Sequence, residues 1–90
     1  MSQLNVELVA ADRRVWAGTA RMVSARSSDG DLGILPGHQP ILTILVAGEV
    51  TIKGEEGTQT ATIDGGFMSV DHDTVRIIAE HVDVTAGSGS

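Results

Sequence analysis

The sequence predicts an all-β fold, built as a sandwich or barrel of short strands, and three observations lead to this prediction. Apolar and polar residues alternate with a period of two along most of the chain, which is typical of half-buried strands. Clusters of turn-forming residues interrupt the alternation at spacings of roughly 8–12 residues, which is typical of such folds. No segment places apolar residues at helical spacing over three turns, so we expect no helix before residue 86.

The expected strands follow one another from the N-terminus. In the first, LNVELV, the side chains of Leu4, Val6 and Leu8 share one face, and the polar residues between them share the other. The later strands are TARMVSAR (19–26), ILTILV (41–46), EVTIK (49–53), TQTATI (58–63), TVRIIA (74–79) and HVDVT (81–85). The predicted core of a two-layer sandwich includes Val6, Leu8, Val50, Ile52, Val75 and Ile77. Trp16 and Phe67 are the only aromatic residues, so we expect an aliphatic core.

Turn signals separate these strands. They are AADRR (10–14), SSDGD (27–31), PGHQP (36–40), AGE (47–49), GEEG (54–57), DGG (64–66) and DHD (71–73). The GEEG segment is the clearest hairpin, because alternating strands flank it on both sides.

Composition limits the class of protein. Ninety residues suit one domain, which we place at residues 1–85, with a flexible Gly/Ser tail or linker stub at 86–90. The net charge of −6 disfavours nucleic acid as a partner. The longest apolar run, ILTILVA, is far shorter than the ~20 residues of a spanning helix, and no secretory signal is evident. We therefore expect a soluble, unexported chain that does not insert into the membrane.

No pattern in the sequence indicates catalysis, a cofactor or a metal. No serine lies in a nucleophile elbow, and cysteine is absent. His38, His72 and His81 are scattered, whereas zinc requires clustered ligands. The triplet Asp71–Asp73 suits a solvated turn better than a cation site. The three glycines within residues 30–37 do not have the spacing of a phosphate-binding loop. We therefore predict that the protein is not an enzyme.

The segment GDLGILPGHQPILT, residues 30–43, combines three glycines with two prolines. Glycine permits a positive φ, while Pro36 and Pro40 fix φ and remove a donor from any sheet ladder. We interpret the segment as a corner that leaves the sheet, turns, and re-enters it as the strand at 41–46.

The same residues carry a resemblance to a known family. The motifs are GDLGILPGH (30–38) with Pro40 and Leu42–Thr43, then Gly65–Phe67 with Val70, and finally Val75, Ile77 and Ala79–Glu80. In this order, and with nearly this spacing, they resemble the epsilon subunit of the F-type ATP synthase, from about Leu4 to Val84. The resemblance implies a flattened two-layer β-sandwich of about ten short strands.

The resemblance also implies a function. In the family this domain lies at the foot of the central stalk, between the gamma subunit and the c-ring. There it supports the coupling of proton-driven rotation to ATP synthesis. The implied chain is non-catalytic, has no cofactor, and in a bacterium is peripheral at the cytoplasmic face of the plasma membrane. We expect the isolated domain to be a monomer.

Individual positions match interface positions of the family. Asp31, with Gly30, matches the position that faces the c-ring loops, and we expect its carboxylate to project into solvent from a turn. His38, Thr43 and Asp64 match positions at the gamma interface. The alternatives are that Asp31 is only a solvated turn residue and that Thr43 is present for its β propensity.

Members of the family usually continue into two C-terminal helices that inhibit ATP hydrolysis and, in some members, bind ATP. This sequence stops at Ser90, so either the helices were removed or this member lacks them. We expect the chain by itself neither to bind ATP nor to inhibit the ATPase. The alternative function is a free-standing β-sandwich binding module, for which two aromatic residues make a poor glycan platform.

Overall fold

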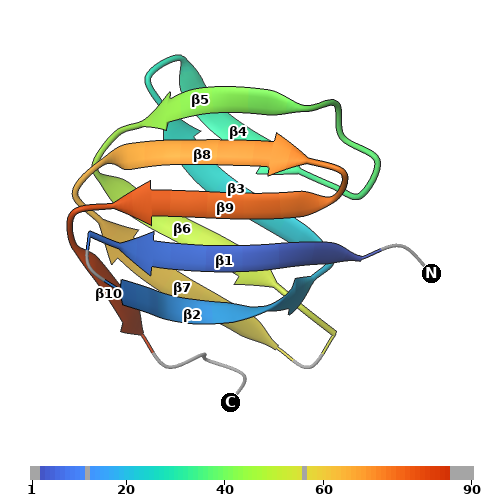
Figure 1. Cartoon of the computed structure of the whole chain (residues 1–90), viewed down its shortest axis with the longest axis horizontal. Coiled ribbons are helices and arrows are strands. Elements are labelled where there is room, and N and C mark those ends of the chain that lie inside the picture. The colour runs from blue at the N-terminus through green and yellow to red at the C-terminus, as the bar shows by residue number, and fades with distance from the viewer. Residues whose placement is uncertain (1–2, 12, 56, 86–90) are drawn as a thin grey trace.

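The computed structural model describes residues 3–11, 13–55 and 57–85, and over these residues it contains strands and no helix (Figure 1). The strands are β1 (Leu4–Ala10), β2 (Arg13–Ala20), β3 (Met22–Ser27), β4 (Gly30–Ile34), β5 (Ile41–Leu45), β6 (Gly48–Lys53), β7 (Thr58–Ile63), β8 (Gly66–Asp71), β9 (Thr74–Ala79) and β10 (Val82–Thr85). The prediction of an all-β fold with about ten short strands is therefore confirmed.

The ten strands form one sheet that folds over itself into two layers. Their order is β10-β7-β6-β3-β5-β8-β9-β1-β2, with β4 paired to β3, and β1–β9 is the parallel pair. In Figure 1 the strands β5, β8, β9, β1 and β2 form a front layer, and β3, β4, β6 and β7 lie behind it. A single bridge, Ser27 to Leu45, carries the sheet from one layer to the other. Because β10 lies near β1 and β2, the sheet nearly closes.

An aliphatic core fills the space between the two layers. All six predicted core residues, Val6, Leu8, Val50, Ile52, Val75 and Ile77, are buried. They pack with Leu4, Val23, Ile34, Leu45, Met68 and Val70, among others. The aromatic residues contribute little to this interior, because Trp16 is only partly buried at its edge and Phe67 is exposed. The expectation of an aliphatic core is confirmed.

Two hairpins follow the turn chemistry of the sequence. The β6–β7 hairpin spans the predicted GEEG turn, where Lys53 pairs with Thr58 and the Gly54 amide donates to the Gly57 carbonyl at 2.8 Å. In the β8–β9 hairpin, His72 and Asp73 have positive φ angles of 50° and 60°. Two consecutive residues in the left-handed region make the type I′ turn that matches the twist of a two-residue hairpin.

The structure corrects several strand assignments. It has β8, and residues 13–18 of β2, where the sequence predicted no strand. The single strand expected at 19–26 is interrupted at Arg21, between β2 and β3, where the Arg21 amide donates to the Lys53 carbonyl at 2.7 Å. The glycine-rich start of the 30–43 segment does not leave the sheet: residues 30–34 form β4 and pair with β3. The Ser27 hydroxyl donates to the Gly30 carbonyl at 2.9 Å and so closes the β3–β4 turn.

Only residues 35–40 leave the sheet between β4 and β5. The tail predicted at 86–90 lies outside the described residues.

Candidate functional site

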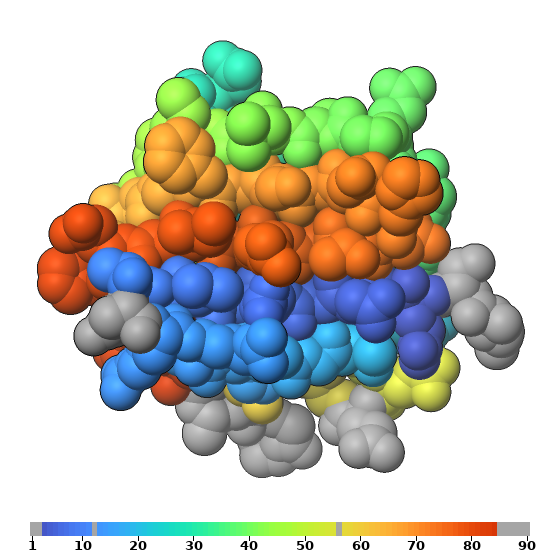
Figure 2. Space-filling model, in the orientation of Figure 1, coloured from blue at the N-terminus to red at the C-terminus, as the bar shows by residue number. Residues whose placement is uncertain are grey.

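An exposed group of large apolar side chains lies on the outer face of the front layer. Its members, with their exposed fractions, are Leu42 (75%), Ile44 (57%), Phe67 (52%) and Ile78 (42%), and we call them the apolar strip. The strand register places Ile44 opposite Phe67 on β8, and Phe67 opposite Ile78 on β9. Figure 2 views this face from outside. Contiguous exposed apolar side chains on a small domain are typical of surfaces that bind a protein, a membrane or another ligand.

Three charged side chains continue the same face beyond the apolar strip. Arg76 Nε donates to Glu7 Oε1 at 2.8 Å, and Arg14 Nε donates to Glu7 Oε2 at 2.7 Å. Hydrogen bonding from Arg76 is the main cause that holds the pKa of Glu7 below its ordinary value of 4.5. The carboxylate is therefore charged near neutral pH and links β9, β1 and β2. We call Glu7, Arg14 and Arg76 the arginine cluster.

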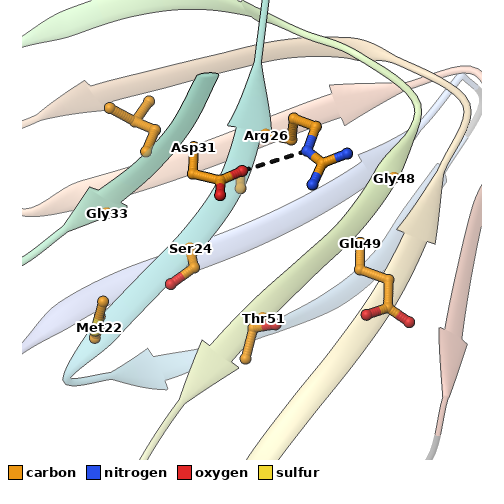
Figure 3. Close-up of a pocket in the computed structure, with 10 residues that line it drawn as sticks. Met22, Ser24, Arg26, Asp31, Gly33, Gly48, Glu49 and Thr51 are labelled. Carbon is orange, nitrogen blue, oxygen red and sulfur yellow. Dashed lines mark hydrogen bonds and ion pairs between the residues drawn. The ribbon is translucent and has the colours of Figure 1, made fainter.

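Asp31 and Gly30 lie at the start of β4, on the back layer. Asp31 is in a strand and not in the expected turn, but its carboxylate is exposed as expected, 3.3 Å from Arg26 Nε. The pair lines a groove of about 620 Å³ that Glu49 and Thr51 of β6 close on the opposite side (Figure 3). The groove carries two carboxylates against one guanidinium, so it favours a cationic or polar ligand group.

His38 is half-buried in the 35–40 loop, next to the β8–β9 hairpin. The Gly37 amide donates to Asp73 Oδ1 at 2.8 Å, and the His38 amide donates to the Leu35 carbonyl at 3.1 Å. Asp73 therefore fixes the loop that carries His38. Sequence reasoning treated Asp73 as part of a solvated turn, because no local pattern reveals a contact between residues 36 positions apart.

The three residues matched to a gamma interface do not lie together. Thr43 alternates along β5 with Leu42 and Ile44, so its side chain is on the inner face of the strand with those of Ile41 and Leu45. This half-buried side chain therefore faces away from the apolar strip. His38 lies near the end of β8, while Asp64 precedes its beginning. Because the six residues of β8 span about 20 Å, His38 and Asp64 lie at opposite ends of the front layer.

Asp64 pairs with His81 in the β9–β10 connection. His81 Nδ1 lies 2.8 Å from Asp64 Oδ2, and the His81 amide donates to Asp64 Oδ1 at 3.3 Å. The side-chain hydrogen bond is the main reason that the pKa of His81 is raised above 6.5 and that the pKa of Asp64 is lowered below 3.8. Both shifts favour the charged pair.

The Asp64–His81 pair makes stability depend on pH. The contribution of His81 is complete below its ordinary pKa of 6.5 and is lost as the pH rises through the raised value. The contribution of Asp64 is present above 3.8 and is lost as the pH falls through the lowered value. We expect His81→Ala to lower the urea midpoint more at about pH 5.5 than at about pH 9. Asp64→Asn is the matched variant, and an equal loss at both pH values would contradict the assignment.

Neither a metal site nor a membrane span is found in the part of the chain that the structure describes. Within residues 3–11, 13–55 and 57–85, no three histidine or acidic residues gather closely enough to hold a metal ion. None of the described residues belongs to a helix long and apolar enough to cross a bilayer.

Comparison with known proteins identifies close relatives. The family profile described as "ATP synthase, Delta/Epsilon chain, beta-sandwich domain" matches residues 3–84. A relative from Micrococcus luteus, named ATP synthase epsilon chain, is 52% identical over 80 residues, which are 88% of this chain and 88% of the relative. One from Streptomyces griseus with the same name is 51% identical, and the match spans 64% of its length. The chain thus spans just under two thirds of the Streptomyces relative.

Solved structures share the fold. A chain of the Euglena gracilis mitochondrial ATP synthase, in a structure of OSCP, F1 and the c-ring, superposes with a TM-score of 0.87 at 22% identity. That match covers 93% of this chain and 54% of the Euglena chain. A chain of the Tetrahymena thermophila central stalk and c-ring superposes with a TM-score of 0.73 at 16% identity, over 88% of this chain and 64% of the other.

Proposed function

Because the chain belongs to the ATP synthase delta/epsilon chain β-sandwich domain family, we propose that it joins the gamma subunit to the c-ring in the central stalk of an F-type ATP synthase. The resemblance recognised in the sequence is confirmed by the family match and by relatives at about 50% identity. The same comparisons confirm a non-catalytic subunit of the ATP synthase complex. They also favour this role over a free-standing binding module.

The apolar strip is the single observation that carries the proposal. A monomer in water gains nothing from four large apolar side chains on a sheet face, whereas burying them against a partner contributes about 25 cal/mol per Å². We assign this face to the gamma subunit. His38 and Asp64 lie at its two ends, so a gamma contact that includes both would run along the whole of β8. Thr43 lies in β5 between Leu42 and Ile44 and supports the strip from the inner side.

The β3–β4 hairpin is the proposed contact with the c-ring. Asp31 is highly exposed, and Gly30 has a φ of +125°, which allows the tight turn that presents it. A cationic side chain on a c-ring loop would compete with Arg26 for the Asp31 carboxylate. Because this contact is wet, screening holds its contribution to about 0–1 kcal/mol. The chain would thereby lie at the membrane surface, on the cytoplasmic face in a bacterium, without crossing the bilayer.

One experiment tests both contacts with opposite expected results. We expect Phe67→Ser to weaken binding to isolated gamma subunit by about 2 kcal/mol, roughly 30-fold, because a central aromatic anchor is lost. Asp31→Ala should leave gamma binding unchanged and weaken attachment to the membrane sector, with a smaller effect as salt rises. Calorimetry with gamma and sedimentation with membrane sectors measure the two affinities. If Phe67→Ser binds gamma like the wild type, or Asp31→Ala loses gamma, the assigned faces are wrong.

A further inference from the structure

The arginine cluster places an excess of positive charge on one face of an acidic protein. Arg14 and Arg76 each donate to the same carboxylate, that of Glu7. One carboxylate cannot neutralise two guanidinium groups, so the cluster carries a net charge of about +1 at neutral pH. The whole chain has a net charge of −6.

The hydrogen bonds leave part of each guanidinium exposed. Both arginines donate to Glu7 from Nε, and more than half of each arginine side chain remains accessible. Among the hydrogen bonds between the described residues, none comes from a terminal nitrogen of either arginine. The Glu7 side chain is only 18% exposed, so it holds the two guanidinium groups from beneath. Arginines fixed in this way lose less entropy when they bind a ligand.

The strand register makes the arginine cluster continuous with the apolar strip. Arg76 lies two residues before Ile78 on β9, so both side chains are on the same face. Ile78 pairs with Val9 on β1, and Val9 pairs with Arg14 on β2. A row of neighbouring side chains therefore runs from the apolar residues of β8 and β9 to the guanidinium groups, with adjacent strands about 4.8 Å apart.

We infer that the arginine cluster receives aspartate or glutamate side chains of the gamma subunit at the border of the apolar strip, an inference that rests on the proposed function. Arginine is enriched at protein interfaces because its planar fork binds carboxylates with two parallel hydrogen bonds. A charged rim beside an apolar centre fixes the orientation of a partner and rejects partners that present cations there. The cluster thus selects an acidic edge on gamma, while the apolar strip supplies the buried area.

The test compares two arginines with a matched cation on the other layer. Arg76→Gln and Arg14→Gln each remove one positive charge from the cluster, and Lys53→Gln removes one from an exposed position on β6. We expect each arginine variant to bind gamma roughly tenfold more weakly than the wild type at about 0.05 M salt, and the difference to shrink at about 0.5 M. Lys53→Gln should bind like the wild type at both concentrations. Arg76→Lys should recover only part of the affinity, because it restores the charge without the fork.

The outcomes separate this inference from the proposed function. Urea unfolding of each variant identifies any loss of fold, and the two arginine variants lie on different strands, so either can decide the result. The inference is overturned if the folded arginine variants bind gamma like the wild type, or if Lys53→Gln weakens binding equally. It is also overturned if the arginine variants lose affinity with no dependence on salt. A wild-type chain that does not bind gamma overturns the proposed function itself, before any variant is measured.

Discussion

Among the glycines of the described residues, we expect Gly66→Ala to be the most destabilising Gly→Ala substitution. A Cβ at this position would lie 2.1 Å from the Ile78 carbonyl oxygen and 3.0 Å from the Ala79 Cα. Those atoms belong to the backbone of β9, which pairs with β8 opposite Gly66, while Leu45 of β5 pairs on the other side. Held from both sides, the strand has no room to move away. The φ of +154° adds strain for any L side chain.

We expect a loss of about 3 kcal/mol or more for Gly66→Ala, a large share of the stability of so small a domain. Urea denaturation followed by circular dichroism measures it. Gly30→Ala is the control, because Gly30 also has a positive φ but has no atom within 4 Å of the added Cβ. The control therefore reports the conformational cost alone, about 1–3 kcal/mol. Equal losses for the two variants would show that the steric contact with β9 is relieved by a shift of the backbone.

Alternation predicted most of the sheet because one face of each strand is buried. In LNVELV and EVTIK the apolar residues occupy every second position, so both the strand and its inward face follow from the sequence. The sequence did not predict β4, because Gly30 and Gly33 resemble turn residues and only the pairing with β3 gives them a strand conformation. It predicted neither β8 nor residues 13–18 of β2. It also did not separate the end of β2 from β3, since the residues on both sides of Arg21 favour strands.

The candidate site was less accessible to sequence reasoning. A family resemblance supplied Asp31, His38, Thr43 and Asp64 one position at a time, and no local pattern gives their arrangement. The arginine cluster depends on a contact between Glu7 and Arg76, which are 69 positions apart. Parallel pairing of β1 with β9 creates that contact, and sheet topology is not written in any short segment.

The apolar strip escaped detection for a different reason. No strand was predicted around Phe67. In the predicted strand at 41–46, no signal separates outward-facing Leu42 and Ile44 from core residues, since an apolar side chain in a strand is usually buried. In TVRIIA, Ile77 and Ile78 are adjacent, so one of them must face outward. Alternation with Val75 correctly assigns Ile77 to the core, and Ile78 is left on the surface with no residue of its own layer to cover it.

Ile77→Ala and Ile78→Ala are therefore expected to separate stability from binding. Ile77 is fully buried between the layers, where it lies opposite Met68 and Leu8 on the neighbouring strands. Its truncation removes buried methylene groups and leaves a cavity, at a cost of about 2–5 kcal/mol. Ile78 is 42% exposed, so its truncation should change the free energy of unfolding by only about 0.5–1 kcal/mol. For gamma binding we expect the opposite: Ile78→Ala should have the larger effect and Ile77→Ala the smaller one.

Ile78→Ala removes part of the apolar strip and should weaken gamma binding by about 1 kcal/mol or more, whereas folded Ile77→Ala keeps the outer face unchanged and should bind like the wild type. Urea denaturation gives the free energy of unfolding, and calorimetry at a temperature where both variants are folded gives the affinity. The two variants remove the same atoms from adjacent positions, so differences in composition and size cancel. The division of β9 into a core face and a binding face would be wrong if the fully folded Ile77→Ala variant lost its affinity for gamma. It would also be wrong if Ile78→Ala unfolded the domain. The side of the strand, and not the apolar character of the residue, is thus what assigns each isoleucine to folding or to the partner.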